Sequence, residues 1–291
     1  MFIILYTRGN NYLMVSTAEI IESYKRFLEV KYPTHYKSYC TRLKNKPESA
    51  KAEAVTFSIL RSNFDDVKLA EDISTGGADF FCSSNDFEFI IEVTCLEAES
   101  VATQSGWQNE VPPNENAFSF GMITHMLRRK ASAKVPQLSG HSIPRILIIT
   151  SEHMGADFLL GPRGAETLLT SNTKIEVPIG KPINKVGLSI DLKDSVFFRF
   201  KDGSLESWRR SISAILLISI FTDKSLICGI LHPDPQYVFP IILLPSVPFL
   251  RLKKWPLENN NIEIESVINK PKEEEFYHRE ITFKNEELKS I

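Results

Sequence analysis

The stretch of residues 77–96, GADFFCSSNDFEFIIEVTCL, carries the clearest fold signal in the chain. Residues 78–82 and 88–96 are rich in aromatic and β-branched side chains, and the polar segment 83–86 lies between them. Two such runs around a short polar turn predict a β-hairpin. A hairpin also fixes which side chains of its two strands lie next to each other.

Two carboxylates of this hairpin are predicted to lie side by side. Asp79 begins the first strand and Glu92 lies within the second. Because side chains alternate between the faces of a strand, Glu92 shares a face with Thr94, opposite Ile91 and Val93. The pattern leaves other roles open, with Asp79 as a turn cap and Glu92 as a solvent-facing residue on a half-exposed strand.

A third acid is predicted to face inward from a helix. Pro47 followed by Glu48 indicates a helix start, and we expect the helix to run to about residue 62. Phe57 and Leu60 lie on its apolar stripe, and the same stripe extends back to Glu53. Glu53 could instead be stabilised by the helix dipole or reach past the rim to water.

Together the three acids predict a divalent-metal site. Carboxylates that lie close together repel each other and are costly to desolvate. A divalent cation removes both penalties, and carboxylate oxygens suit Mg²⁺ or Mn²⁺. We therefore expect Asp79, Glu92 and Glu53 to be its ligands. A cation at this place would polarise a phosphodiester and activate water.

Basic side chains lie on the next predicted helix, residues 118–134. Lys130 and Lys134 continue its apolar face at helical spacing, beside Arg128 and Arg129. We expect Lys130 to contact the scissile phosphate or to orient water. Arg128, Arg129 and Lys134 are expected to hold flanking phosphates. Lysines at such positions are also found as rim residues that extend to solvent.

These motifs resemble the PD-(D/E)XK nuclease superfamily of restriction-endonuclease-like proteins. The resemblance rests on Glu53, on Gly77-Ala78-Asp79-Phe80 and on Ile91-Glu92-Val93-Thr94, and it covers residues 45–150. It implies an α/β fold whose αβββαβ core has a mixed central sheet flanked by helices. It also implies that Asp79 and Glu92 bind metal, that Glu53 is the additional helix acid, and that the reaction is hydrolysis of DNA or RNA, as in bacterial defence or restriction.

Two positions depart from the family pattern. Ala78 stands where the family usually has proline, and Thr94 stands where the catalytic lysine is expected. A threonine hydroxyl can position water but carries no positive charge. Some members carry the lysine on another element, and Lys130 is the natural candidate here. If no lysine reaches the site, the resemblance implies an inactive relative that binds nucleic acid or protein.

The remaining sequence predicts more sheet and two extensions. Ser16 and Glu19 have capping-box spacing at a helix start, and residues 103–117 are expected to form a loop. Short strands are expected at 67–69 and 196–200, and apolar runs typical of buried strands occupy 143–150, 211–220 and 226–231. The chain then divides into an N-terminal extension (1–44), a nuclease-like core (45–150), a sheet extension or second subdomain (151–257) and a charged C-terminal appendage (258–291).

Composition limits the remaining possibilities. The chain has 34 Lys+Arg against 36 Asp+Glu, so it has no global positive field, although a local basic cleft remains compatible with nucleic acid. No Gly-x-Ser-x-Gly elbow and no P-loop occurs.

The expected setting of the protein can be inferred from its cysteines and its apolar runs. Four widely spaced cysteines without zinc-type spacing suit the reducing cytoplasm, and no apolar run approaches the ~20 residues of a membrane helix. We expect a cytoplasmic protein whose partner is nucleic acid, DNA first, with no membrane contact. The C-terminal half could also mediate a homodimer or bind a protein partner.

Overall fold

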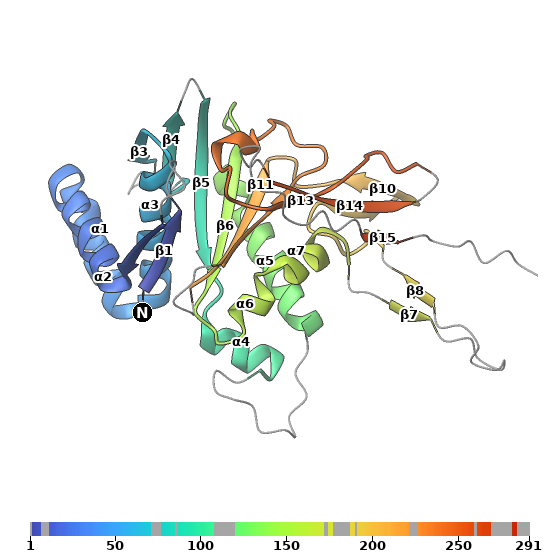
Figure 1. Cartoon of the computed structure of the whole chain (residues 1–291), viewed down its shortest axis with the longest axis horizontal. Helices are drawn as coiled ribbons and strands as arrows, with labels where there is room; N and C mark the ends of the chain where they lie inside the picture. The colour runs from blue at the N-terminus through green and yellow to red at the C-terminus, as the bar shows by residue number, and fades with distance from the viewer. Residues whose placement is uncertain are drawn as a thin grey trace, which may run out of the picture.

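A nine-stranded mixed sheet runs through the molecule (Figure 1). In sheet order its strands are β15 (Ile281–Phe283), β14 (Ile262–Val267), β13 (Phe249–Leu252), β12 (Leu226–Leu231), β11 (Ala214–Ser219), β6 (Arg145–Ser151), β5 (Phe87–Cys95), β4 (Phe80–Ser84) and β3 (Asp66–Leu69). The computed structural model describes residues 2–6, 12–70, 77–84, 87–107, 120–171, 174–176, 187–189, 191–220, 226–258, 261–268 and 281–283.

Helices and three small hairpins complete the described part of the chain. The helices are α1 (Thr17–Lys31), α2 (Pro33–Asn45), α3 (Pro47–Asn63), α4 (Ala98–Ser105), α5 (Phe120–Leu138), α6 (Ala156–Leu159) and α7 (Pro162–Leu169), with a 3-10 turn at Ile241–Leu243. The hairpins pair β1 (Phe2–Tyr6) with β2 (Tyr12–Ser16), β7 (Lys174–Glu176) with β8 (Gly187–Ser189), and β9 (Phe198–Lys201) with β10 (Ser204–Ser207).

The centre of the sheet is parallel and its flanks contain antiparallel pairs. β5 pairs with β6 and β6 pairs with β11, both in parallel, whereas β3, β4 and β5 form an antiparallel set. β11 comes from the 151–257 segment, so this segment adds strands to the same sheet as the 45–150 segment. The fold is therefore mixed α/β, with a central mixed sheet flanked by helices.

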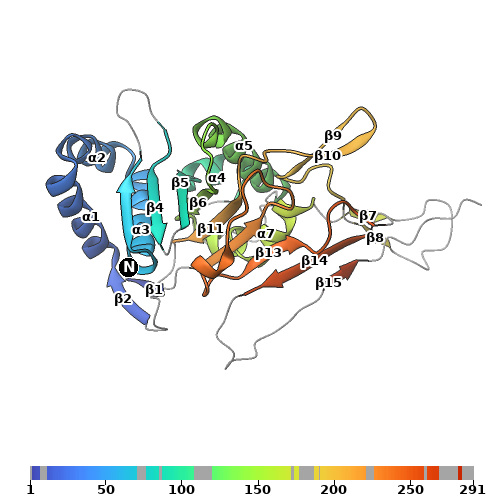
Figure 2. The same ribbon diagram turned by 90° about the horizontal axis from the view of Figure 1, so that it is seen from above.

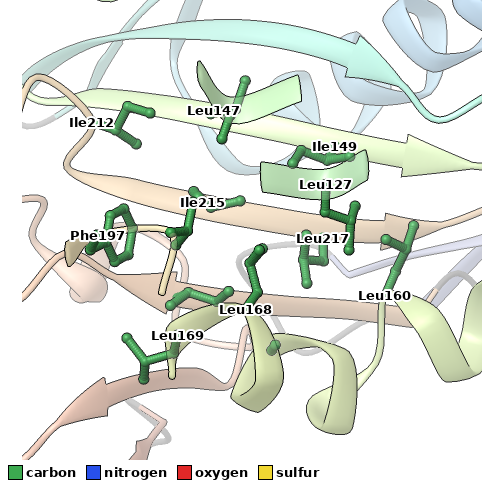
Figure 3. Close-up of a cluster of buried hydrophobic side chains, with 14 of the residues drawn as sticks. Leu127, Leu147, Ile149, Leu160, Leu168, Leu169, Phe197, Ile212, Ile215 and Leu217 are labelled. Atoms are coloured by element: carbon green, nitrogen blue, oxygen red, sulfur yellow. The ribbon is translucent and has the colours of Figure 1, made fainter. Parts of the chain in front are cut away.

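Two apolar cores lie on the two faces of this sheet. On β6, Ile146 and Ile148 face the core that holds α1 and α3, while Leu147 and Ile149 face the core that holds α5 and α7. Figure 3 shows part of the second core, where Leu127 of α5 and Leu168 of α7 lie over β6 and β11. Burial on both faces explains why the central strands read as continuous apolar runs. Figure 2 shows α1–α3 and α5 on opposite sides of β4 and β5.

Local sequence signals account for the helix starts. Ser16 caps α1, and its side chain and that of Glu19 form the reciprocal bonds of a capping box. Pro47 occupies the first position of α3, where its missing N–H has no partner to lose. Both starts confirm the sequence prediction. None of the helices in the described ranges has the length and apolarity that a membrane crossing requires.

Three expectations about elements were wrong or incomplete. α2 was not expected, although Tyr36, Tyr39 and Leu43 recur in it at helical spacing and pack on the core. α4 continues to Ser105, inside the segment expected to be a loop, and residues 108–117 of that segment lie outside the described residues. The segment from residue 258 is not simply an appendage. Its strand β14 pairs with β13, because Ile262 and Ile264 alternate with acids and bury one face.

Candidate functional site

The hairpin β4–β5 places Asp79 next to Glu92. The register pairs Phe80 with Ile91, so the preceding residue, Asp79, falls opposite Glu92. β4 begins only at Phe80, so the neighbouring part of β5 has no β4 backbone to pair with. Asp79 fills that place, because its Oδ2 accepts a hydrogen bond of 2.6 Å from the Val93 amide. Asp79 thus caps the open side of β5 as well as standing beside a second acid.

Glu92 is buried and carries an ion pair with α5. It is only 2% exposed, and its Oε1 lies 2.6 Å from the Lys134 Nζ. Its neighbour in the alternation, Thr94, is also buried on the same face, as predicted. The lysine at the acidic site is therefore Lys134, which the sequence pattern assigns to a flanking phosphate.

The geometry of α5 explains why Lys134 rather than Lys130 meets Glu92. α5 connects the parallel strands β5 and β6, so it runs back along β5 in the opposite direction. A residue later on α5 therefore lies beside an earlier residue of β5. Lys130 lies one turn, or about 6 Å, before Lys134 along α5. It is near Cys95, where its charge slightly opposes the burial that raises the pKa of this thiol to about 12.

Glu53 is buried on the other side of the sheet. It projects from α3 into the layer formed by α1–α3, whereas Glu92 faces α5. The Tyr24 hydroxyl donates to its Oε1 at 2.6 Å, and the Arg42 guanidinium lies 2.6 Å from its Oε2. These bonds satisfy the carboxylate within α1–α3, which favours a structural contribution.

The three acids influence one another electrostatically. Burial raises the pKa of Asp79 well above its usual value, and the Glu92 and Glu53 carboxylates raise it further, while the Val93 amide and Lys134 act in the opposite direction. Burial and the Glu53 carboxylate likewise raise the pKa of the Tyr24 hydroxyl, so this hydroxyl stays protonated and donates to Glu53. The geometry has thus concentrated negative charge around Asp79.

The donor set fits a cation only in part. Among the residues that the structure describes, no three His, Cys, Asp or Glu side chains converge closely enough to hold a metal ion. Asp79 and Glu92 supply hard carboxylate oxygens from neighbouring strands, and the crowding of acids favours an added positive charge. Glu53, bonded to Tyr24 and Arg42, is not positioned as a third ligand. A cation here would therefore rest on two protein carboxylates.

The predicted phosphate-binding arginines lie on the same helix but differ in their surroundings. Arg128 is half-buried and donates to the Thr167 carbonyl of α7 at 3.2 Å, and burial lowers its pKa. Arg129 is exposed. Arg128 therefore ties α5 to α7, while Arg129 is accessible to a ligand.

The sequence interpretation missed the partners of the acids. Tyr24 lies on a visible apolar stripe of α1, but nothing in its spacing indicates that it bonds Glu53. Arg42 lies in α2, a helix that was not expected at all. Lys134 did have a signal, since it continues the apolar face of α5 one turn beyond Lys130.

No protein-family model matches this chain, and neither does any curated protein or any solved structure. What the site can do chemically therefore has to be inferred from its own geometry.

Proposed function

We propose that the protein is a metal-dependent nuclease that hydrolyses phosphodiester bonds of nucleic acid, DNA first. The observation that carries the proposal is the placement of Asp79 opposite Glu92, with Lys134 bonded to the buried Glu92. Two acids and a cationic side chain that meet on neighbouring elements are suited to binding a cation and a phosphate together. This set agrees with the resemblance to PD-(D/E)XK nucleases, with the lysine supplied by α5.

Each residue of the site has a role in this proposal. Asp79 and Glu92 would hold Mg²⁺ or Mn²⁺, which when bound polarises the phosphodiester and activates water. Lys134 holds positive charge next to the site and stabilises charge that develops on the phosphate. Thr94, buried on the same face, would hydrogen-bond the attacking water. Lys130 and Arg129 remain candidates for contacts with flanking phosphates.

The element order supports the finer fold assignment. α3, β3, β4, β5, α5 and β6 succeed one another as α, β, β, β, α and β, with α4 inserted before α5. We propose that they form the αβββαβ core of the restriction-endonuclease-like fold. The four cysteines are all free, which favours a reducing compartment such as the cytoplasm for this activity.

Cleavage of labelled DNA and RNA in Mg²⁺ or Mn²⁺ tests the proposal. Asp79→Asn and Glu92→Gln keep the side-chain shape and remove the charge. Both variants should lose at least about 100-fold in rate, as expected when a group that stabilises the transition state is removed. The exposed α1 residue Glu29 gives a matched control, and Glu29→Gln should cleave like wild type. Cleavage by folded Asp79→Asn and Glu92→Gln at the wild-type rate would disprove the site.

A second candidate function is a non-catalytic module with the same fold. The observation in its favour is that the buried acids already have cationic partners, Lys134 on Glu92 and Arg42 on Glu53. In that case Asp79 and Glu92 stabilise the sheet, and the protein binds nucleic acid or another protein without cleaving it. Calorimetric titration with Mn²⁺ separates the two candidates, because heat that is lost in the Asp79→Asn/Glu92→Gln double variant indicates a cation site.

A further inference from the structure

The hairpin β9–β10 presents aromatic and cationic side chains together. Figure 2 shows it projecting from the body of the molecule beyond α5. Its turn is Asp202-Gly203, and both residues have positive φ, 49° and 81°, as a two-residue hairpin turn requires. Phe200 on β9 is 55% exposed, and Trp208, just after β10, is 38% exposed. Both rings are therefore accessible to a ligand on this hairpin.

Trp208 is fixed by a buried arginine. The Arg209 guanidinium lies 3.7 Å from the centre of the Trp208 ring, a close cation–π contact. Arg209 in turn donates to the Val196 carbonyl and to the Ser132 hydroxyl of α5. Its backbone φ of 56° is left-handed, which is uncommon for arginine and is maintained here by those bonds. Arg209 thus contacts the Trp208 ring while part of the ring stays exposed.

A second arginine covers Trp208 only loosely. The Arg199 guanidinium is 5.9 Å from the ring centre, at the outer limit of a cation–π contact. Arg199 is exposed and lies opposite Glu206 across the hairpin. The two form an ion pair, with 3.2 Å between the Arg199 Nη2 and the Glu206 Oε2. Such a surface ion pair contributes little and is easily exchanged. A planar ligand can therefore approach Trp208 where Arg199 now lies.

The exposed cations of the hairpin are paired with acids on the same surface. Arg199 pairs with Glu206, Lys201 with Asp202 and Arg210 with Asp234, so a phosphate would exchange with these carboxylates. Lys193 lies 5.5 Å from the centre of the exposed Phe200 ring, and Lys201 is exposed at the hairpin tip. Phe200 lies on the face of the hairpin opposite Arg199, whereas Arg199 and Lys201 share the face of Glu206 and Trp208. An exposed ring with two cations on the same face suits a single nucleic-acid strand, because bases stack on such a ring while cations hold phosphates.

We propose that the β9–β10 hairpin binds single-stranded nucleic acid, with an unpaired base stacked on Trp208 and the adjoining phosphates held by Arg199 and Lys201. Nucleic acid as the partner rests on the proposed function. The hairpin is connected to the helix of the acidic site, since Ser132, which anchors Arg209, and Lys134, which bonds Glu92, both lie on α5, about 200° apart around its axis.

Tryptophan fluorescence of the full chain with a thymidine oligomer of about 12 nucleotides, in EDTA to prevent cleavage, tests the proposal. Stacking quenches Trp208, so wild type should show quenching that Trp208→Phe lacks, although Trp107 and Trp255 remain. Trp208→Ala should weaken binding by roughly tenfold or more. Arg199→Gln/Lys201→Gln should weaken binding by about tenfold at low salt and reduce its salt dependence.

A matched control uses two exposed lysines on the opposite layer. Lys31→Gln/Lys37→Gln removes the same charge from α1 and α2 and should leave the affinity unchanged. Equal weakening by both charge variants, or equal quenching in wild type and folded Trp208→Phe, would overturn the proposal. Tighter binding of a blunt duplex than of the oligomer would contradict the proposal that an unpaired base stacks on Trp208. The two proposals fail separately: Trp208-dependent binding without cleavage rejects only the nuclease, and cleavage with binding indifferent to Trp208 rejects only the hairpin.

Discussion

At the scale of single residues, the pair Glu92–Lys134 distinguishes the two lysines of α5. Lys134→Ala should abolish cleavage and lower the free energy of unfolding by about 1–3 kcal/mol, because it removes the partner of a buried carboxylate. Lys130→Ala should retain most of the cleavage activity and of the stability, since Lys130 lies one turn away from the pair. Cleavage rates and urea denaturation of the two variants check this. The reverse ranking would restore Lys130 to the role that the sequence predicted.

A compensating substitution separates the structural effect from the catalytic effect. Glu92→Gln in the Lys134→Met background removes both charges of the pair, so the buried charge no longer lacks its partner. The double variant should therefore recover stability while remaining unable to cleave. Recovery of cleavage would show that neither charge takes part in the chemistry.

His232 predicts how stability depends on pH. It is 4% exposed; its Nε2 lies 2.8 Å from the Trp208 carbonyl, and its Nδ1 accepts from the Asp234 amide at 2.9 Å. Burial lowers its pKa from 6.5 to about 4, so the folded state stays neutral while the unfolded state takes up a proton. Neutral His232 therefore contributes about 3 kcal/mol to the free energy of unfolding. This contribution is fully present above pH 6.5 and is lost as the pH falls to about 4.

Comparison with His232→Gln isolates that contribution from other titrating groups. The variant should be less stable than wild type at pH 7, and the difference should shrink steadily between pH 6.5 and 4. Denaturant unfolding at several pH values measures it. A difference that stays constant across this range would show that His232 does not titrate differently in the two states.

At the scale of elements, the joint between β12 and β13 is tightly packed. Gly229 pairs with Phe249, and a Cβ at residue 229 would lie 2.2 Å from the Phe249 ring. Gly229→Ala should therefore destabilise the protein by about 1–3 kcal/mol through overpacking. Thermal or urea unfolding measures the loss. The double variant Gly229→Ala/Phe249→Ala should lose less than the two single variants added together, and strict additivity would contradict the predicted contact.

The elements that the sequence predicted are those whose signals are local. The strand runs at 88–96 and 226–231 and the helix starts at Ser16 and Pro47 depend on neighbours within a few residues, and the structure places elements there. The sequence prediction missed α2 and β14, although Tyr36, Tyr39 and Leu43 have helical spacing and Ile262 and Ile264 alternate with acids. Which strand β14 pairs with is not visible in its own sequence. The acids were visible because inward-facing carboxylates break the pattern. Their partners Tyr24 and Arg42 were not, since those contacts join distant segments.

At the scale of the whole molecule, the 45–150 segment depends on the 151–257 segment for its packing. β6 is buried along its whole length, between β5 and β11, and both apolar cores combine residues from the two segments. A fragment of residues 1–151 should therefore lack a cooperative thermal transition and near-UV circular dichroism, while the full chain shows both. A fragment that unfolds cooperatively would show that the N-terminal half folds as an independent domain.

The pairing of β6 with β11 also bears on how the protein is made. On the ribosome, β6 emerges long before β11, which pairs with its second edge, because Ile146 pairs with Ala214 far along the chain. During that interval the run RILIITS presents open backbone groups and apolar side chains, the features by which nascent chains associate with one another. Synthesis of this protein therefore includes a period in which its central strand has to be shielded, and faster translation or chaperone binding across residues 152–219 should raise the yield of folded chain.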